Sequence, residues 1–324
     1  MKQLQFSVWL IFLTATVCFS QGDTVQKQIP FTSLQTAAAN QKTTNYNSRR
    51  WLVGSASAAA FGGSFIFLNK AWYQDYPRTS FHFFNDAGEW LQMDKAGHAW
   101  TAYTSSRLLY GAWRWAGLKN EKAVLLSTLT SLGYMASIEY LDGRSAGWGW
   151  SWGDITGNTF GASLFAVQQL GWKEQRVQLK FSAHVNKYDA SLKARADELF
   201  GTSLPALLLK DYNAQTYWFS FNLKSFLPRS KLPAWLNVAA GYGAEGMWGG
   251  FDNTAYDKNG AKVFDRTDIP RRRQWYLSPD IDLTKIRTKS RALRTILFAL
   301  NSLKMPLPDL EYSRGKWSVH AFSF

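Results

Sequence analysis

Cysteine is all but absent from this chain of 324 residues, in which Cys18 is the only one. It lies near the start, where Lys2 precedes an apolar run from Val8 to Val17 and small residues stand at positions 18 and 20. That pattern predicts a secretory signal peptide over residues 1–20, cleaved after Ser20. The mature chain would then contain no cysteine, which excludes disulfides, thiol chemistry and cysteine-ligated metals.

A lipid anchor on Cys18 is the alternative processing route. Such anchors are attached at a motif of small residues followed by cysteine, and Val17 is larger than that motif prefers. We therefore expect an exported protein of the bacterial cell envelope, in the periplasm or associated with the outer membrane, without assuming that it is lipidated.

Acidic residues are also few, 23 against 37 lysines and arginines, which gives a net charge of +14. Aromatic residues are abundant, with 16 Trp, 14 Tyr and 22 Phe. Trp and Tyr concentrate where hydrocarbon meets water, and basic surfaces are attracted to anionic headgroups. We expect membrane lipid as the partner, with anionic headgroups, and no nucleic acid. A solvated basic face that keeps the protein soluble is the simpler alternative.

Long hydrophobic runs are scarce after the polar linker that we predict for residues 21–50. The segment Trp51–Trp72 is rich in Ala, Gly and Ser and is long enough to cross a bilayer, which takes about 20 residues. Three further predicted helices, Asp94–Ala116, Glu121–Tyr140 and Trp152–Leu170, all carry charged residues. They fit either membrane spans with a polar interior or a bundle lying on the membrane.

Residues after Gly171 change to the alternating pattern of half-buried strands. The chain is thus predicted to be α+β: a bundle of about four apolar helices over residues 51–172, membrane-embedded or membrane-apposed, then an antiparallel sheet or partial barrel over residues 173–324. A helix is expected over Leu293–Leu303. The predicted strands are Arg176–Ser182, Thr216–Leu223, Leu236–Met247, Arg273–Leu283 and Lys316–Phe324.

A glycine pattern in the β-rich part matches the dinucleotide-binding fingerprint as a string, with Gly241, Gly243 and Gly246 at the right spacing. The fingerprint needs a helix to begin at its third glycine. The residues that follow, Met247-Trp-Gly-Gly250, do not favour a helix. We therefore expect these glycines to permit strand bending or close packing, and no nucleotide.

Ionisable residues recur in the helical part, within residues 94–98, 139–144 and 151–162. Burying several of them is unfavourable unless they pair with one another. We therefore predict that side chains from three helices meet in one polar network or binding site. Its members are Asp94, Lys95, His98, Glu139, Asp142, Arg144, Asp154 and Asn158.

Helical spacing supports this prediction. Asp94 and His98 are four residues apart, as are Asp154 and Asn158, so each pair shares one face of its helix. Small residues beside the second pair allow another helix to approach closely. The glycines of this packing stripe are Gly153, Gly157 and Gly161.

Most of these residues also have a purely structural explanation. Asp94 fits a helix N-cap, and Ser151 with Asp154 fits a capping box that stabilises a helix start by about 1 kcal/mol. Glu139 is less easily explained, because a carboxylate in a last helical turn opposes the macrodipole and needs a cation such as Lys95, His98 or Arg144. We favour a structural network over a binding or catalytic site.

The catalytic alternative is a lipid-phosphate hydrolase or transferase. In it His98, with Glu139 or Asp154, would serve as base and orienting group, while Lys95 and Arg144 held a substrate phosphate. The Ser-Arg-x5-His string that acid-phosphatase-type lipid phosphatases need occurs only at Ser313–His320, in the predicted β-rich part and not in the helical part that contains His98, Glu139 and Asp154. We therefore lean towards a protein that is not an enzyme.

A metal site is arithmetically possible from Asp94, His98, Glu139 and Asp154. With no cysteine and one histidine it would be a weak zinc site. We expect no metal and no cofactor.

The same residues carry a family resemblance. The order Asp-Lys-x-x-His, a helix ending in Glu, a Gly-Arg turn and Ser-x-x-Asp-x-x-x-Asn-x-x-Gly resembles the VanZ-like membrane proteins. Asp94-Lys-Ala-Gly-His98 with Trp148-Gly-Trp-Ser-Trp-Gly-Asp154 is similar to the YfiM-type predicted periplasmic lipoproteins, a domain of unknown function. The resemblance covers about Asp94–Gln169 and implies a compact helical envelope domain. The weak lipid-anchor site and the long β-rich tail depart from these families.

Overall fold

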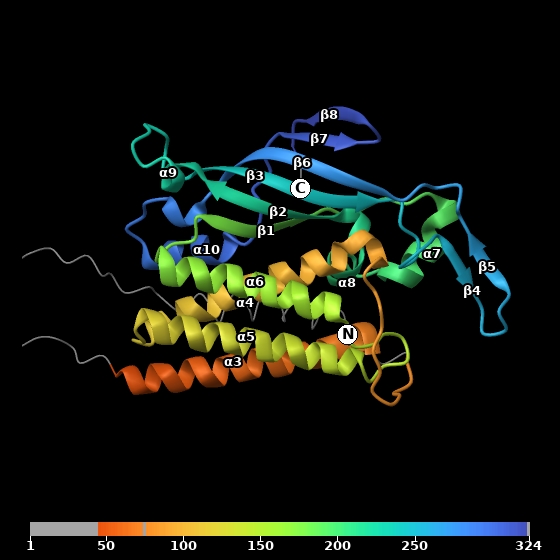
Figure 1. Ribbon diagram of the computed structural model, residues 1–324, viewed down its shortest axis with the longest axis horizontal. Helices are drawn as coiled ribbons and strands as arrows, with labels where there is room; N and C mark the ends of the chain where they lie inside the picture. The colour runs from red at the N-terminus through yellow and green to blue at the C-terminus, as the bar shows by residue number, and fades with distance from the viewer. Residues whose placement is uncertain (1–44, 74–75, 323–324) are drawn as a thin grey trace, which may run out of the picture.

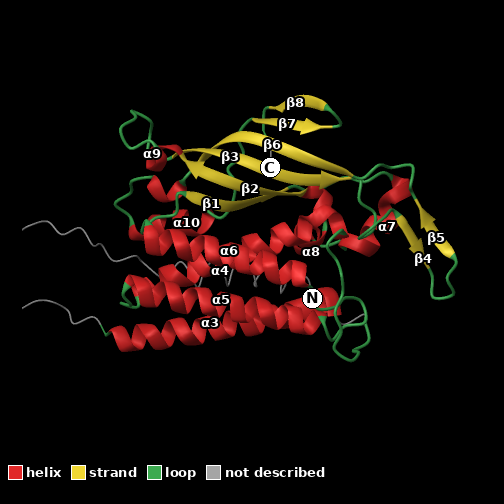
Figure 2. Ribbon diagram, in the orientation of Figure 1, coloured by secondary structure: helices red, strands yellow, loops and turns green. Residues whose placement is uncertain are grey.

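A computed structural model describes residues 45–73 and 76–322 of the chain. The predicted signal peptide and most of the predicted linker lie outside these residues. Figures 1 and 2 show a layer of long helices with a twisted sheet above it, and a smaller group of helices and two short strands at one end. The coarse prediction of an α+β protein with helices first and a mainly antiparallel sheet after them is confirmed.

Four long helices form the lower layer. They are α3 (Tyr46–Leu68), α4 (Met93–Trp115), α5 (Asn120–Asp142) and α6 (Trp152–Gly171), with a π-helical turn η3 (Asn69–Tyr73) after α3 and a 3-10 turn η4 (Glu89–Gln92) before α4. Helix α3 begins five residues earlier than predicted, because Asn45 caps it by accepting a hydrogen bond from Ser48 N at 3.2 Å. Among the described helices only α3 is long and apolar enough to cross a membrane, so four such helices are not seen.

Helices α4 and α6 pack closely because glycines face the contact. A Cβ atom added to Gly161 would lie 1.9 Å from the carbonyl oxygen of Ala99, and one added to Gly157 would lie 2.8 Å from that of Lys95. At Gly153 the nearest atom would be Lys95 Cε at 2.8 Å. The predicted glycine stripe therefore faces α4, and it brings the polar residues of both helices into one layer.

The main sheet has six strands in the order β1-β2-β3-β6-β7-β8, and every neighbouring pair is antiparallel. Between β3 and β6 the chain makes a separate hairpin of β4 and β5. The strands are β1 (Val177–Ala183), β2 (Gln215–Asn222), β3 (Leu236–Glu245), β4 (Thr254–Tyr256), β5 (Lys262–Asp265), β6 (Arg272–Ile281), β7 (Asp309–Ser313) and β8 (Lys316–His320).

Shorter helices connect these strands. They are α7 (Ala190–Phe200), α8 (Leu204–Lys210), η5 (Tyr212–Ala214), α9 (Leu223–Phe226), η6 (Leu283–Lys285) and α10 (Arg291–Leu300). The five predicted strands and the helix at α10 are present. Strands β4, β5 and β7 were not predicted, because each is short and none shows a long alternating pattern.

The sheet buries its polar side chains and exposes many of its apolar ones. On β2, Ser220 and Asn222 are fully buried, whereas Phe219 and Phe221 are more than one third exposed. The buried polar face continues on the neighbouring strands, where Lys180 forms an ion pair of 2.7 Å with Asp280 and both side chains are inaccessible to solvent. This arrangement reverses the usual one for a sheet with one face on a core.

The glycines of the rejected fingerprint lie at the end of β3 and in the turn after it. A Cβ atom on Gly241 would lie 2.6 Å from the Trp218 ring, and Gly246 has a φ of +74°. No helix follows Gly246 directly. Close packing and a turn account for these residues, as the sequence analysis expected.

Replacing Gly161 with alanine is predicted to destabilise the protein strongly. The added methyl group would collide with the α4 backbone, which cannot move as a side-chain tip can, and overpacking of this kind costs about 1–3 kcal/mol or more. Gly133→Ala on α5 is the matched control, because a Cβ there meets nothing within 4 Å and alanine favours a helix by up to about 1 kcal/mol. Urea unfolding of both variants checks this; equal effects on stability would contradict it.

The free energy of unfolding is predicted to increase as the pH rises above about 8, because Lys304 is buried. Burial lowers the pKa of Lys304 to about 8, although Asp280 partly opposes the shift. Between this value and the ordinary lysine pKa, the unfolded chain binds more protons than the folded one. Folding therefore gains up to about 1.4 kcal/mol per pH unit in that window. Urea unfolding at pH 7.5, 8.5 and 9.5 measures this. The free energy of unfolding should increase with pH in the native chain, and this increase should be absent in Lys304→Met.

Candidate functional site

A strained turn leads into the helix that carries the first site residues. Trp90, Leu91 and Gln92 all have positive φ values, a conformation that non-glycine residues rarely adopt. The turn is held in place by the other half of the molecule: Trp90 N donates to Gly250 O at 2.7 Å, and the Tyr242 hydroxyl donates to Leu91 O. The position of α4 is therefore tied to the sheet.

Lys95 lies at the centre of a group of carboxylates. Its Nζ atom forms ion pairs with Asp94 Oδ2 at 2.7 Å, with Asp154 Oδ1 at 3.0 Å and with Asp86. Asp94 and Asp154 each lie in the first turn of a helix, where the macrodipole favours a negative charge. Burial alone would lower the pKa of Lys95, but Asp94 and Asp154 outweigh it and raise that pKa, so the side chain stays charged.

Ser151 links the third carboxylate to the start of α6. Its hydroxyl donates to Asp86 Oδ1 at 2.5 Å and accepts a hydrogen bond from Asp154 N at 3.0 Å. The capping interaction expected for Ser151 is thus present. Asp86 was missed in the sequence analysis, since it lies in a loop eight residues before Asp94 and shares no helical periodicity with the other members.

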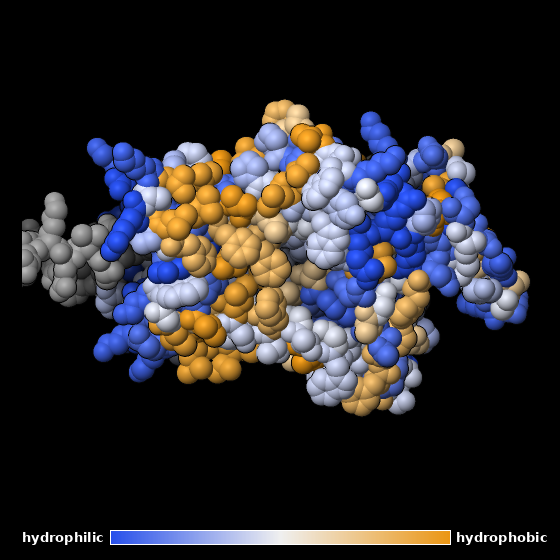
Figure 3. All heavy atoms as spheres, turned by 45° about the horizontal axis from the view of Figure 1, so that its top comes forward, coloured by the Kyte–Doolittle hydropathy of each residue, from blue (hydrophilic) through white to orange (hydrophobic). Residues whose placement is uncertain are grey.

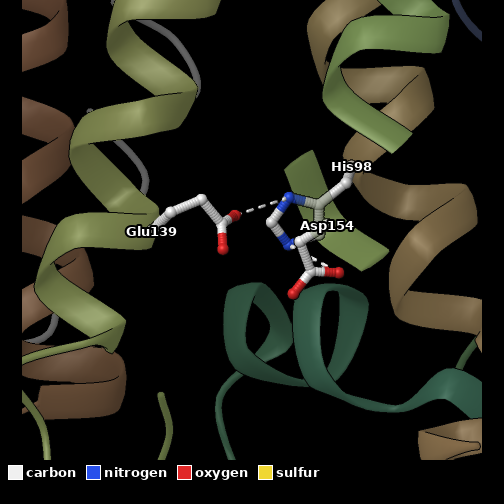
Figure 4. A group of neighbouring side chains, drawn as sticks. All are labelled: His98, Glu139 and Asp154. Carbon is white, nitrogen blue, oxygen red and sulfur yellow. Dashed lines mark ion pairs between the residues drawn. The ribbon is translucent and has the colours of Figure 1, made fainter. Parts of the chain in front are cut away.

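His98 lies between two carboxylates from different helices, as Figure 4 shows. Its Nδ1 atom is 3.3 Å from Glu139 Oε1 on α5, and its Nε2 atom is 3.8 Å from Asp154 Oδ1 on α6. Asn158 Oδ1 lies 3.1 Å from the same Nδ1, and Asn158 Nδ2 donates to Glu139 Oε1 at 3.4 Å. Helices α4, α5 and α6 thus each contribute a side chain to one contact.

Burial changes the protonation behaviour of these groups. It raises the pKa of Glu139 to about 8, a shift that His98 opposes and Asp154 adds to. It also raises the pKa of Asp94 to about 6. For His98 burial alone would lower the pKa, but Asp154 and Glu139 outweigh it and raise that pKa. The titration of His98 and that of Glu139 are therefore coupled, because the charge of each group shifts the pKa of the other.

The structure brings most of the predicted network together. We call the group formed by Asp86, Asp94, Lys95, His98, Glu139, Asp154 and Asn158 the core cluster. Asp142 lies beside it, and the Tyr73 hydroxyl donates to Asp142 Oδ1 at 2.7 Å. Burial raises the pKa of Asp142 to about 6, and the charge of His98 partly opposes this.

Arg144 does not lie in the interior with the other predicted members. It is exposed at the turn after α5, so it does not supply Glu139 with a buried counter-ion. Lys95 is already shared by three carboxylates. These two residues are therefore poorly placed to hold a substrate phosphate, which was the role they had in the hydrolase or transferase alternative.

Comparison with known proteins supports the family resemblance. Residues 82–169 match the model of a family described as predicted periplasmic lipoprotein (DUF2279), and every member of the core cluster lies within this range. The assignment of this segment to that family and the expected location in the cell envelope are confirmed, whereas the VanZ-like resemblance is not shown. No curated protein and no solved structure matches the chain.

Removing the lysine of the core cluster is predicted to destabilise the fold. Lys95→Met leaves three carboxylates in the interior without their shared cation, and breaking a buried ion pair costs about 3–5 kcal/mol. Lys262→Met is the matched control, because it removes an exposed ion pair with Asp265, and such pairs contribute about 1 kcal/mol or less. Chemical unfolding measures both; a loss in Lys95→Met no larger than in the control would contradict the prediction.

Proposed function

We propose that this protein is an envelope protein that docks the apolar side of its sheet on an anionic lipid membrane. The observation that carries the proposal is the inverted sheet, with polar side chains inside and apolar side chains exposed. A sheet that faces lipid has this distribution, because hydrocarbon takes the place of the protein core on the outer face. We call the exposed residues the apolar sheet face: Phe219, Phe221, Trp275, Leu277, Tyr312, Trp317 and Val319.

Strand register places these residues in continuous rows. One row crosses the sheet through Phe219, Ala240, Leu277, Leu310 and Val319. Helix α6 packs at one end of this row, where Phe160 contacts Phe219. The helices and the turn before α4, where Leu91 contacts Tyr242, therefore cover β1, β2 and part of β3, and no described helix covers the apolar side chains of β6 to β8.

The neighbouring row is aromatic, and it runs through Tyr217, Tyr242, Trp275, Tyr312 and Trp317. Adjacent rings in it are close: Tyr242 and Trp275 lie 4.9 Å apart between ring centroids, as do Tyr312 and Trp317. Rows of Trp and Tyr mark the level at which hydrocarbon gives way to headgroups.

The size of the apolar sheet face also suits a membrane. Along β6 it runs from Trp275 to Ile281, about 20 Å at about 3.3 Å per residue. The apolar band of outer-membrane β-barrels is about 25 Å tall. Figure 3 shows hydrophobic residues across the middle of one side of the molecule, between hydrophilic ends. The helices also expose apolar residues, among them Leu125, Leu129 and Val167.

Positive charge gathers at the end of the sheet where β2 and β6 finish. Asp282 N donates to Trp235 O at 2.8 Å, which holds the two connecting loops together. Exposed basic residues of these loops attract anionic headgroups next to the apolar sheet face. They are Arg229, Lys231, Arg287 and Lys289, and Arg291 follows at the start of α10. This combination of basic loops and an aromatic row favours lipid over a second protein.

Flotation with lipid vesicles tests the proposal. The full chain should float with vesicles that contain phosphatidylglycerol and bind less to neutral ones. Val319→Asp places a carboxylate on the apolar sheet face and should weaken binding at least tenfold, about 1.4 kcal/mol. Val263→Asp is the matched control: Val263 is also a strand valine and is 64% exposed against 77% for Val319, but it lies on the separate hairpin.

Circular dichroism confirms that both variants are folded before binding is compared. Equal flotation of the two variants would overturn the proposal. It would also fail if Val319→Asp dissociated an oligomer in gel filtration while vesicle binding stayed unchanged, because the face would then bind a second copy.

A further inference from the structure

His98, Glu139 and Asp154 converge from α4, α5 and α6 inside the helical layer, where one oxygen of each carboxylate forms an ion pair with a nitrogen of the imidazole ring (Figure 4). One nitrogen or oxygen atom of each residue lies within 4.8 Å of the corresponding atoms of the other two. The ligand atoms of a tetrahedral zinc site, with bonds of about 2.0–2.1 Å, lie about 3.4 Å apart. Movements of about 1 Å in these side chains would close them around an ion.

One carboxylate oxygen of Glu139 has no hydrogen-bond partner among the described residues. Its side chain is fully buried, and Oε1 faces His98 and Asn158. The other oxygen, Oε2, is buried and has no hydrogen-bond partner among the described residues. Buried carboxylate oxygens are nearly always paired, because they have lost the water that would otherwise satisfy them. A buried acceptor without a partner, on the carboxylate that contacts His98, therefore indicates a place for a cation.

Charge balance leads to the same conclusion. The core cluster contains the four carboxylates of Asp86, Asp94, Glu139 and Asp154, whereas its cationic side chains are Lys95 and His98. Lys95 is shared by three of the four, and its contacts do not include Glu139. Glu139 has His98 as its cationic partner and shares it with Asp154, so a divalent ion would balance the two negative charges that remain in the cluster.

The surrounding residues orient the imidazole for this role. Asn158 Oδ1 lies 3.1 Å from His98 Nδ1, which leaves Nε2, on the side of Asp154, to bind the ion. Asn158 also donates to Glu139, so a single amide positions two ligands. The His98 side chain is 20% exposed, and this gives an ion a route to the site.

We propose that His98, Glu139 and Asp154 bind one divalent transition-metal ion of the zinc or manganese class. One imidazole and two carboxylates, without a thiolate, suit these ions and disfavour soft copper(I). The proposal departs from the expectation of no metal that the sequence supported. Burial of Glu139 and its open oxygen are the reason, and neither is visible in the sequence. It does not depend on the lipid proposal, since no ligand lies on the apolar sheet face.

Metal titration of the full-length protein tests this. The purified chain is stripped with a chelator and dialysed, then titrated separately with ZnCl₂, MnCl₂ and MgCl₂ by calorimetry, with bound metal counted by mass spectrometry. We expect one equivalent of zinc or manganese per chain and weaker binding of magnesium. Zinc at about 100 times its Kd should shift the folding equilibrium about 100-fold, seen as a higher Tm.

Variants locate the site. His98→Ala and Glu139→Gln should each lose the tight equivalent, and Asn158→Ala should weaken it about 10–100-fold, as residues behind a metal ligand do. His184→Ala, which removes an exposed histidine paired with Asn186, is the matched control and should bind like the native chain.

Two results would overturn the proposal: less than one third of an equivalent bound to the native chain, or one equivalent retained by both His98→Ala and Glu139→Gln. Loss of binding in the His184→Ala control would place the ion at the surface and also overturn it. If either ligand variant is unfolded by circular dichroism, Asp154→Asn replaces it in the comparison, and the Tm shift of the native chain remains an independent readout.

Discussion

Burial of more carboxylates than cations is the constraint on which the helical layer depends. Asp86, Asp94 and Asp154 are tolerated because Lys95 reaches all three and because two of them lie at helix N-termini. Glu139 has neither advantage, since it lies in the last turn of α5. The three helices must therefore keep one relative position, because any shift would leave a charge unpaired in the interior.

Two contacts hold that position. Glycines on α6 let its backbone touch that of α4, and the strained turn before α4 is attached to the sheet through Tyr242 and Gly250. The site and the sheet are thus parts of one structure. A proposed metal ion in the helices and a proposed lipid contact on the strands are chemically separate, but each relies on a scaffold that both halves build.

The sheet also buries charged and polar side chains, but there they pair with one another. Its polar face is closed by Lys180, Asp280 and their neighbours, which satisfy one another without water. Among the described residues, the helical layer covers the apolar face near β1 and β2 and at Tyr242 of β3. Exposed apolar area of this extent is unfavourable in water and becomes favourable against hydrocarbon, which is why we place lipid there.

The sequence by itself determined the long helices, most strands of the main sheet and the residues of the core cluster on the helices. Helical periodicity and strand alternation are local signals, so Asp94 with His98 and Asp154 with Asn158 were recognisable four residues apart. Alternation does not say which face is buried, and the inward polar face of the sheet was decided only by tertiary packing. The same holds for Asp86, which joins Lys95 from a loop, for Arg144, which stays at the surface, and for the open oxygen of Glu139. Each depends on contacts between segments far apart in the chain, and no local pattern records them.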